Sequence, residues 1–221
     1  MNALRILTAS LTALFLAAAP PAFAQQGKVV PRADLAGHVA WQFAEVDSDG
    51  PYINHEDWHS SLFGGVSAGW HWTPHWKTEV DLGASTGTNA YRTTTIVFQG
   101  HQAYQPSRLH FSRRTVGISQ QYQFFENAWF HPHVGAGVNL TWERRIEDFE
   151  RPIIIAPIPM PPGPIERRTE GPVTEFTARP FIAAGAKLYI TERAFFRSDV
   201  RFAFRGGLDE TLTRFGFGFD F

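Results

Sequence analysis

Cysteine is absent from the 221-residue sequence. This absence excludes a disulfide framework, so the fold must be stabilised by burial or by a closed network of hydrogen bonds. It also excludes a lipid anchor attached to a cysteine after an export signal.

Long apolar runs are absent after residue 24, where no run reaches even a dozen apolar residues. A membrane-spanning helix needs about 20 of them. The mean hydropathy is mildly polar at -0.20. The sequence therefore excludes a helical membrane protein.

A strong charge of one sign is also lacking, because the formal net charge is -1 at pH 7. Nucleic-acid binding domains usually carry a clear excess of basic residues. We therefore expect no nucleic-acid partner.

The N-terminus has the pattern of a secretory signal. Residues 2–5 end in Arg5, residues 6–19 are apolar, and Ala22-Phe23-Ala24 offers a small-x-small cleavage site. We predict that residues 1–24 are removed and that 25–33 form a short periplasmic lead-in. The alternative, a retained anchor, is disfavoured because the apolar run is too short to span a bilayer.

Aromatic residues are abundant, at 14% of the chain, and they alternate with small or polar residues. In the last eight residues every second position is phenylalanine, up to Phe221. The positions between them are Arg214, Gly216, Gly218 and Asp220. This period of two is typical of a strand with one apolar face.

The same alternation recurs along the chain and predicts seven earlier strands, at 34–45, 60–73, 77–88, 114–124, 131–143, 175–190 and 194–206. Upstream of the fourth strand, Leu109 and Phe111 are out of phase with Val116. We expect either a β-bulge near Arg113 or a loop that contains Leu109 and Phe111.

The predicted connections alternate between long and short. The long ones are 46–59, 89–108 and 144–172, whereas short turns follow the second, fourth and sixth strands. Outer-membrane barrels have short periplasmic turns and long extracellular loops. We therefore predict an all-β fold over 34–221, an eight-stranded antiparallel up-and-down transmembrane β-barrel. A secreted soluble barrel is the alternative.

Charged residues on the inward faces are expected to pair across the lumen. The predicted network contains Glu79, Asp81, Arg197, Asp199, Arg201, Arg205, Arg214 and Asp220. An eight-stranded barrel is narrow enough for side chains to fill it, so a closed lumen is expected. A small or gated pore lined by the same residues is the alternative.

The chain resembles the small eight-stranded outer-membrane barrels of Gram-negative bacteria, the OmpA/OmpX-like superfamily. Its C-terminus is similar to the assembly signal of that family, here Arg214, Gly216, Phe219 and Phe221. The resemblance implies a location in the outer membrane and recognition by the barrel-assembly machinery and periplasmic chaperones. It also implies contact with outer-membrane lipid and lipopolysaccharide. We expect a monomer with a structural, envelope-integrity or surface-interaction role.

Three loop segments contain residue types that could support a function. The first is a set of metal-ligating residue types, Asp47, Asp49, His55, Glu56, Asp57 and His59, whose loose spacing favours a solvated loop. The second, His110 and Ser112 with Glu126 downstream, has a weak similarity to the lipase-like triad of lipid A deacylases. Its departures from that pattern, such as Arg113 after the serine, make this hydrolase the least favoured function.

The third feature is the stretch 153–165, which interleaves isoleucine and proline and predicts an extended, polyproline-like chain. It is either a stiff loop folded onto the rim or a contact surface for a partner. No cofactor or metal is expected for the protein.

Overall fold

The computed structural model describes residues 32–45, 52–55, 58–98, 101–124, 129–150, 153–154 and 168–221. The predicted signal and nearly all of the predicted lead-in lie outside these ranges. The described residues form eleven strands, which are β1 (Ala33–Glu45), β2 (Tyr52–His55), β3 (Trp58–His71), β4 (Trp76–Ser85), β5 (Thr88–Phe98), β6 (His101–Gln123), β7 (Phe130–Phe149), β8 (Ile153–Ile154), β9 (Arg168–Tyr189), β10 (Ala194–Phe204) and β11 (Leu208–Asp220). In these ranges no helix is long and apolar enough to cross a membrane.

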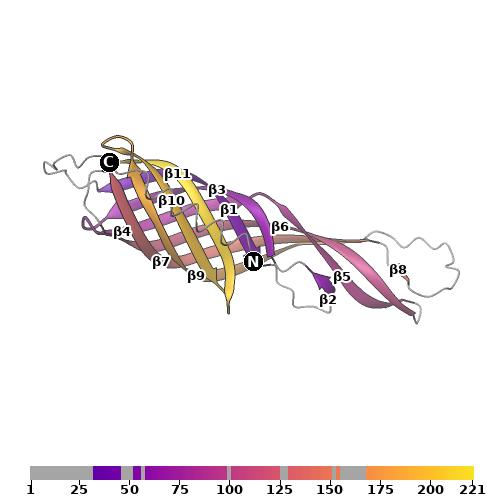
Figure 1. The fold of residues 1–221 in the computed structure, drawn as a ribbon. Coiled ribbons are helices and arrows are strands. Elements are labelled where there is room, and N and C mark those ends of the chain that lie inside the picture. The colour runs from indigo at the N-terminus through magenta and orange to yellow at the C-terminus, as the bar shows by residue number, and fades with distance from the viewer. Residues whose placement is uncertain are drawn as a thin grey trace, which may run out of the picture.

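Eight of the described strands close into a ring (Figure 1). Their order is β1, β3, β4, β6, β7, β9, β10 and β11, and β11 pairs with β1 again. Every pairing is antiparallel, so the predicted up-and-down barrel is confirmed. Closure leaves no unpaired sheet edge in the wall, as strands in hydrocarbon require.

The barrel is apolar outside and polar inside. On β11, Phe217 and Phe219 are 63% and 58% exposed, whereas Arg214 and Asp220 are 2% and 3% exposed. β1 follows the same rule, with Val39 outside and Gln42 buried. This arrangement is the opposite of that in a soluble protein. It confirms the prediction that the apolar face of each strand points outward, and it suits a wall that is surrounded by lipid.

Three strands of the ring continue well beyond the barrel. β6, β7 and β9 contain 23, 20 and 22 residues, whereas β1 has 13. β5 pairs with the first half of β6 from Thr88↔Phe111 to Phe98↔His101, and β2 pairs with β5. We call the outer parts of these strands, residues 88–98 of β5, 101–111 of β6, 145–149 of β7 and 168–173 of β9, the extension. It projects from one end of the barrel in Figure 1.

The extension corrects two predicted loops. Most of 89–108 is a β-hairpin, and the ends of 144–172 are strand. These segments lack a strongly apolar face, so their sequences do not show the alternation that predicts a strand. A strand outside the membrane needs no such face, because backbone pairing and β-branched residues such as Thr93, Thr94 and Thr95 are enough to form it. Of 153–165, only β8 is described, and it pairs with Ala103 and Tyr104 of β6.

The phase change upstream of the fourth predicted strand also has a different origin. β6 pairs with β7 without a register shift from Ser107 to Gln123, so β6 itself contains neither a bulge nor a loop there. The irregularity near Arg113 lies in the neighbouring segment, because Ala84 of β4 pairs with Arg114 whereas Thr88 of β5 pairs with Phe111, which leaves three residues (85–87) opposite two (112 and 113). Leu109 and Phe111 instead point inward and are buried with Ala90. Above the lipid-facing band the surroundings are water, so apolar side chains turn to the inner face.

Short connections lie at the other end of the barrel, at residues 72–75, 124–129 and 190–193. The chain ends there as well, where the Phe221 amide donates to the Ala33 carbonyl (2.8 Å) and the Arg32 amide donates to the Phe221 carbonyl (3.0 Å). We call this the turn end, in contrast to the extension end.

Candidate functional site

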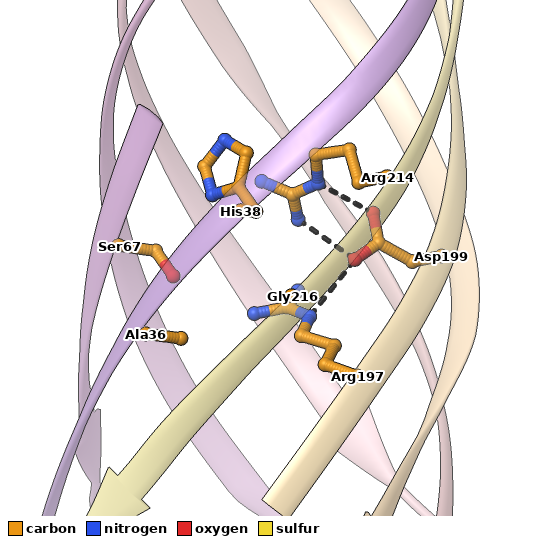
Figure 2. A pocket seen from close by; sticks show the side chains of 7 residues that line it. All are labelled: Ala36, His38, Ser67, Arg197, Asp199, Arg214 and Gly216. Atoms are coloured by element: carbon orange, nitrogen blue, oxygen red, sulfur yellow. Dashed lines mark hydrogen bonds and ion pairs between the residues drawn. The ribbon is translucent and has the colours of Figure 1, made fainter. Parts of the chain in front are cut away.

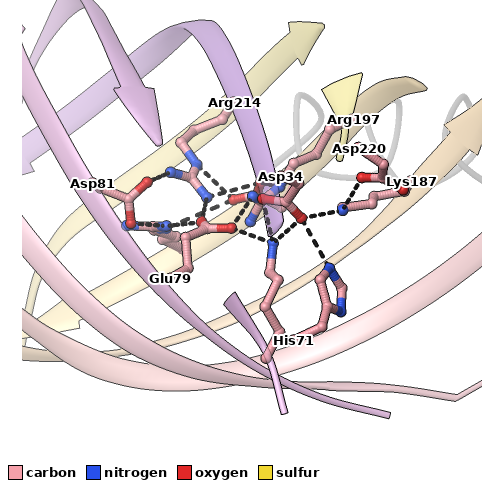
Figure 3. Close-up of polar contacts among 11 residues, drawn as sticks. Asp34, His71, Glu79, Asp81, Lys187, Arg197, Arg214 and Asp220 are labelled. Atoms are coloured by element: carbon pink, nitrogen blue, oxygen red, sulfur yellow. Dashed lines mark hydrogen bonds and ion pairs between the residues drawn. The ribbon is translucent and has the colours of Figure 1, made fainter. Parts of the chain in front are cut away.

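Six of the eight predicted lumen residues meet in one buried cluster, which we call the central network (Figure 3). Its members are Glu79 and Asp81 of β4, Arg197, Asp199 and Arg201 of β10, and Arg214 of β11. In the ring, β4 and β10 are four strands apart and therefore face each other. The network thus bridges the full width of the lumen.

The contacts in the central network are short and reciprocal. Arg201 Nη2 lies 2.7 Å from Asp81 Oδ2, and Arg214 Nη1 lies 2.6 Å from Asp81 Oδ1. Arg214 Nε and Arg197 Nε donate to the two oxygens of Asp199 at 2.7 and 2.8 Å. Three carboxylates thus balance three guanidinium groups, which offsets the cost of burying each charge.

The space left beside this network is small. A cavity of about 10 Å³ is lined by Ala36, His38, Ser67, Arg197, Asp199, Arg214 and Gly216, which Figure 2 shows. Such a volume holds about one water molecule. The central network therefore fills the lumen at this level.

Asp220, the seventh predicted lumen residue, lies in a separate cluster near the turn end. Its carboxylate accepts a hydrogen bond from the Tyr189 hydroxyl and lies 3.6 Å from Lys187 Nζ. Lys187 also contacts Asp34, which Lys77 reaches at 3.0 Å. Lys77 Nζ lies 2.6 Å from Glu79 Oε2 and joins this cluster to the central network.

The turn-end cluster contains residue types that bind metals. Single ligand atoms of Asp34, His71 and Asp220 lie within 4.8 Å of one another. However, the Asp34 carboxylate is already held by the ammonium groups of Lys77 and Lys187. The lysines supply the positive charge that a metal ion would bring.

Arg205 is the exception among the predicted lumen residues. It is exposed at the extension end of the barrel, where its Nη2 lies 2.9 Å from Glu175 Oε1. It follows the last residue of β10, in the turn before β11. The strict alternation ends there with the strand, so the placement of Arg205 inside the lumen was wrong.

Sequence reasoning missed a third buried cluster, which lies at the extension end. Arg113 Nε contacts Glu143 Oε2 at 2.6 Å, and its Nη1 contacts Glu210 Oε2 at 3.2 Å. Arg179 pairs with Asp209. The signal was present, because Arg113 and Glu143 have the inward parity of Thr115 and Thr141. The same alternation of inward and outward positions, applied to every charged residue, also predicts that Lys187 points into the lumen.

An open groove lies on the outside of the wall, where the extension begins. We call it the outer groove; it has a volume of about 270 Å³ and is lined by Gly87, Thr88, Asn89, His110, Phe111, Ser112, Arg144 and Ile146. His110 Nε2 lies 3.1 Å from Asp148 Oδ2, and its Nδ1 contacts Asn89 Oδ1. Hydrogen bonds from Thr169 and His110 hold the pKa of Asp148 below its usual range.

The contacts of His110 in the outer groove do not match those of a hydrolase triad. His110 and Ser112 share the outer groove, but both ring nitrogens of His110 are engaged by Asn89 and Asp148. A general base needs a ring nitrogen directed at the serine hydroxyl. Glu126 lies outside the described residues.

The predicted metal-ligating loop is described only in part. Asp47, Asp49, Glu56 and Asp57 lie outside the described residues, as does the side chain of His55. His59 is buried on β3, where the centroid of its ring lies 5.8 Å from the Phe111 ring centroid in an edge-to-face arrangement. It thus points toward the interior of the barrel and not into a loop.

The predicted assembly residues are divided between the two faces of the wall. Phe219 and Phe221 are 58% and 70% exposed on the outside. Arg214 belongs to the central network, and Gly216 lies on the inner face. A Cβ at Gly216 would lie 2.5 Å from the Gly37 carbonyl oxygen. Their recognition by an assembly machinery stays a prediction.

Comparisons with known proteins agree with this architecture. The crystal structure of Neisserial surface protein A matches with a TM-score of 0.52 and 11% identity, covering 86% of this chain and 97% of that one. Ail, the attachment invasion locus protein of Yersinia pestis, matches with a TM-score of 0.52 and 7% identity, covering 87% and 100%. At such identity the likeness shows the fold alone. No curated protein matches the sequence.

A family model assigns the chain more directly. The model described as the outer membrane protein beta-barrel domain matches residues 9–221, which is most of the sequence. Together with the closed ring and its apolar outer face, this match places the protein in the outer membrane. The chain belongs to the outer membrane protein beta-barrel family.

Proposed function

We propose that this protein is a closed, non-enzymatic barrel that anchors a surface-interaction element, the extension, in the outer membrane. The observation that carries this proposal is the contrast between the two parts of the molecule. The lumen is crossed by buried ion pairs, whereas β6, β7 and β9 continue beyond the barrel and pair there with β5 and with one another.

The orientation follows from the connections. In outer-membrane barrels the short turns face the periplasm and the long segments face the outside. The extension would therefore stand on the cell surface. Two similar structures carry names that refer to a surface protein and to attachment and invasion, and these names support the same kind of role here.

A shortened hairpin tests the proposal. Tyr91 and Arg108 are paired across β5 and β6, so residues 92–107 can be replaced by Asn-Gly, which favours a two-residue hairpin turn. β6 keeps its barrel pairings with β4 and β7 from residue 114 onward. The variant should insert normally, which a heat-modifiability gel checks.

Cells expressing wild type or the shortened variant would then be compared for adhesion to host-cell monolayers and for aggregation with one another. We expect the wild type to increase one of these properties and the variant to lose the increase. Equal behaviour of both strains at equal surface levels would contradict a surface-interaction role for the hairpin.

A further inference from the structure

Two arginines project from the outside of the wall at the level where the apolar band ends. Arg114 of β6 and Arg144 of β7 are both exposed. Across the β6–β7 pairing, Arg114 lies opposite Trp142 and Arg144 lies opposite Ser112, which makes the arginines diagonal neighbours on one face. Within the described ranges neither guanidinium group has an acidic partner.

The surface on one side of these arginines is apolar. Moving toward the turn end, the outward residues are Ile118 of β6 and Leu140 and Trp142 of β7, which are 56%, 36% and 40% exposed. These side chains belong to the band that faces lipid. An amphiphile with its chains along this band would bring its headgroup to the two arginines.

The surface on the other side is polar and hollowed. The outer groove begins at Arg144 and is also lined by the polar residues Thr88, Asn89, His110 and Ser112. Its volume of about 270 Å³ is several times that of a water molecule, so it has room for a bulky polar group. The Asp148 carboxylate is held by Thr169 and His110 and does not line the groove.

We propose that Arg114, Arg144 and the outer groove bind the phosphate-bearing headgroup of a lipid in the outer leaflet. Guanidinium groups bind phosphate oxygens through paired hydrogen bonds, and hydroxyl groups can complete the contact. The direct continuity with the lipid-facing band favours a lipid over a free phosphate ion. The inference rests on the orientation under the proposed function, in which the extension end faces outward.

The first test varies the lipid and uses the unchanged protein. The barrel is reconstituted in phosphatidylcholine nanodiscs that contain a few per cent of either bisphosphorylated lipid A or dephosphorylated lipid A with the same acyl chains. Native mass spectrometry then counts the glycolipids retained on the released protein. We expect several-fold more retention of the phosphorylated lipid, and equal retention would overturn the proposal.

The second test varies the protein. The double variant Arg114→Gln/Arg144→Gln should retain phosphorylated lipid A roughly tenfold less well, because two charge-assisted contacts are lost. Arg193→Gln is the matched control, since Arg193 is an exposed arginine at the turn end. Retention by the double variant equal to that of wild type, or an equal loss in Arg193→Gln, would overturn the proposal. A heat-modifiability gel checks that each variant is folded.

Two further measurements separate the possible sources of phosphate and the two proposals. Inorganic phosphate that competes as strongly as the lipid would overturn the assignment to a lipid. The hairpin-shortened variant keeps Thr88, Asn89, His110 and both arginines, so it should retain the lipid as wild type does. Loss of adhesion with retained lipid binding in this variant would support both proposals, whereas retained adhesion with retained lipid binding would overturn only the proposed function. Loss of lipid binding in this variant would overturn the assignment of the lipid to Arg114, Arg144 and the outer groove.

Discussion

At the scale of single residues, the position of a charge in the wall decides what it contributes. Arg201 and Arg205 are four residues apart, but Arg201 is 3% exposed and contacts Asp81 and Glu79, whereas Arg205 pairs with Glu175 at the rim. Removing one partner of a buried ion pair leaves a buried charge uncompensated. An exposed pair is screened by water.

We therefore predict that Arg201→Gln lowers the free energy of unfolding by about 3–5 kcal/mol. Arg205→Gln should lower it by at most about 1 kcal/mol. Urea unfolding of both variants in the same lipid or detergent, followed by tryptophan fluorescence, measures the difference. Equal losses of unfolding free energy in the two variants would show that the central network stabilises the barrel no more than the exposed pair of Arg205 and Glu175 does.

Much of the residue pattern could be predicted from the sequence, because alternation fixes which side chains point inward. It could not show that Asp220 meets Tyr189 and Lys187 instead of Arg214, since that depends on the stagger between strands. Nor could it place Arg205, because parity has no meaning once a strand has ended.

At the scale of strands, glycine matters where a neighbouring strand comes close to the inner face. A Cβ at Gly185 of β9 would lie 2.3 Å from the Ser198 carbonyl oxygen and 2.4 Å from the Asp199 Cβ. Gly37 of β1 has nothing within 4 Å of such an atom. Both are strand glycines, so backbone entropy affects them alike.

We predict that Gly185→Ala destabilises the barrel by about 1–3 kcal/mol, because the β9–β10 contact has to open and Asp199 has to shift. Gly37→Ala should be neutral or slightly stabilising. Urea midpoints of the two variants provide the comparison. A loss in Gly37→Ala as large as that in Gly185→Ala would refute a packing role for the inner glycine.

The eight barrel strands could be predicted because lipid imposes a strong alternation on them. The strands of the extension could not, because water lies outside that part of the sheet and no apolar outer face is required. The reversal at Phe111 marks the level where one environment replaces the other. Arg114 and Arg144 lie at the same level, so the proposed lipid site lies where the lipid-facing surface of the barrel ends.

At the scale of the whole molecule, the C-terminal strand has two proposed duties. Phe221 is 70% exposed and takes no part in the lumen, whereas Arg214 is held by Asp81 and Asp199. We predict that deleting Phe221 reduces the amount of inserted protein in cells. Arg214→Ala should insert but unfold at lower urea concentration. The amount of protein in membrane fractions measures insertion, and the urea midpoint measures stability. If both variants showed the same loss of insertion and the same loss of stability, the two residues would not have separate roles.

Ion pairs close the lumen of this barrel, and recording in planar lipid bilayers is the sharpest test of that closure. Purified, refolded protein would be added at increasing amounts, with a known porin as the positive control for detection. We predict no reproducible unit conductance, since the central network spans the lumen from β4 to β10. Uniform conductance steps from the wild-type protein, absent from a mock purification, would contradict the account and favour a small pore.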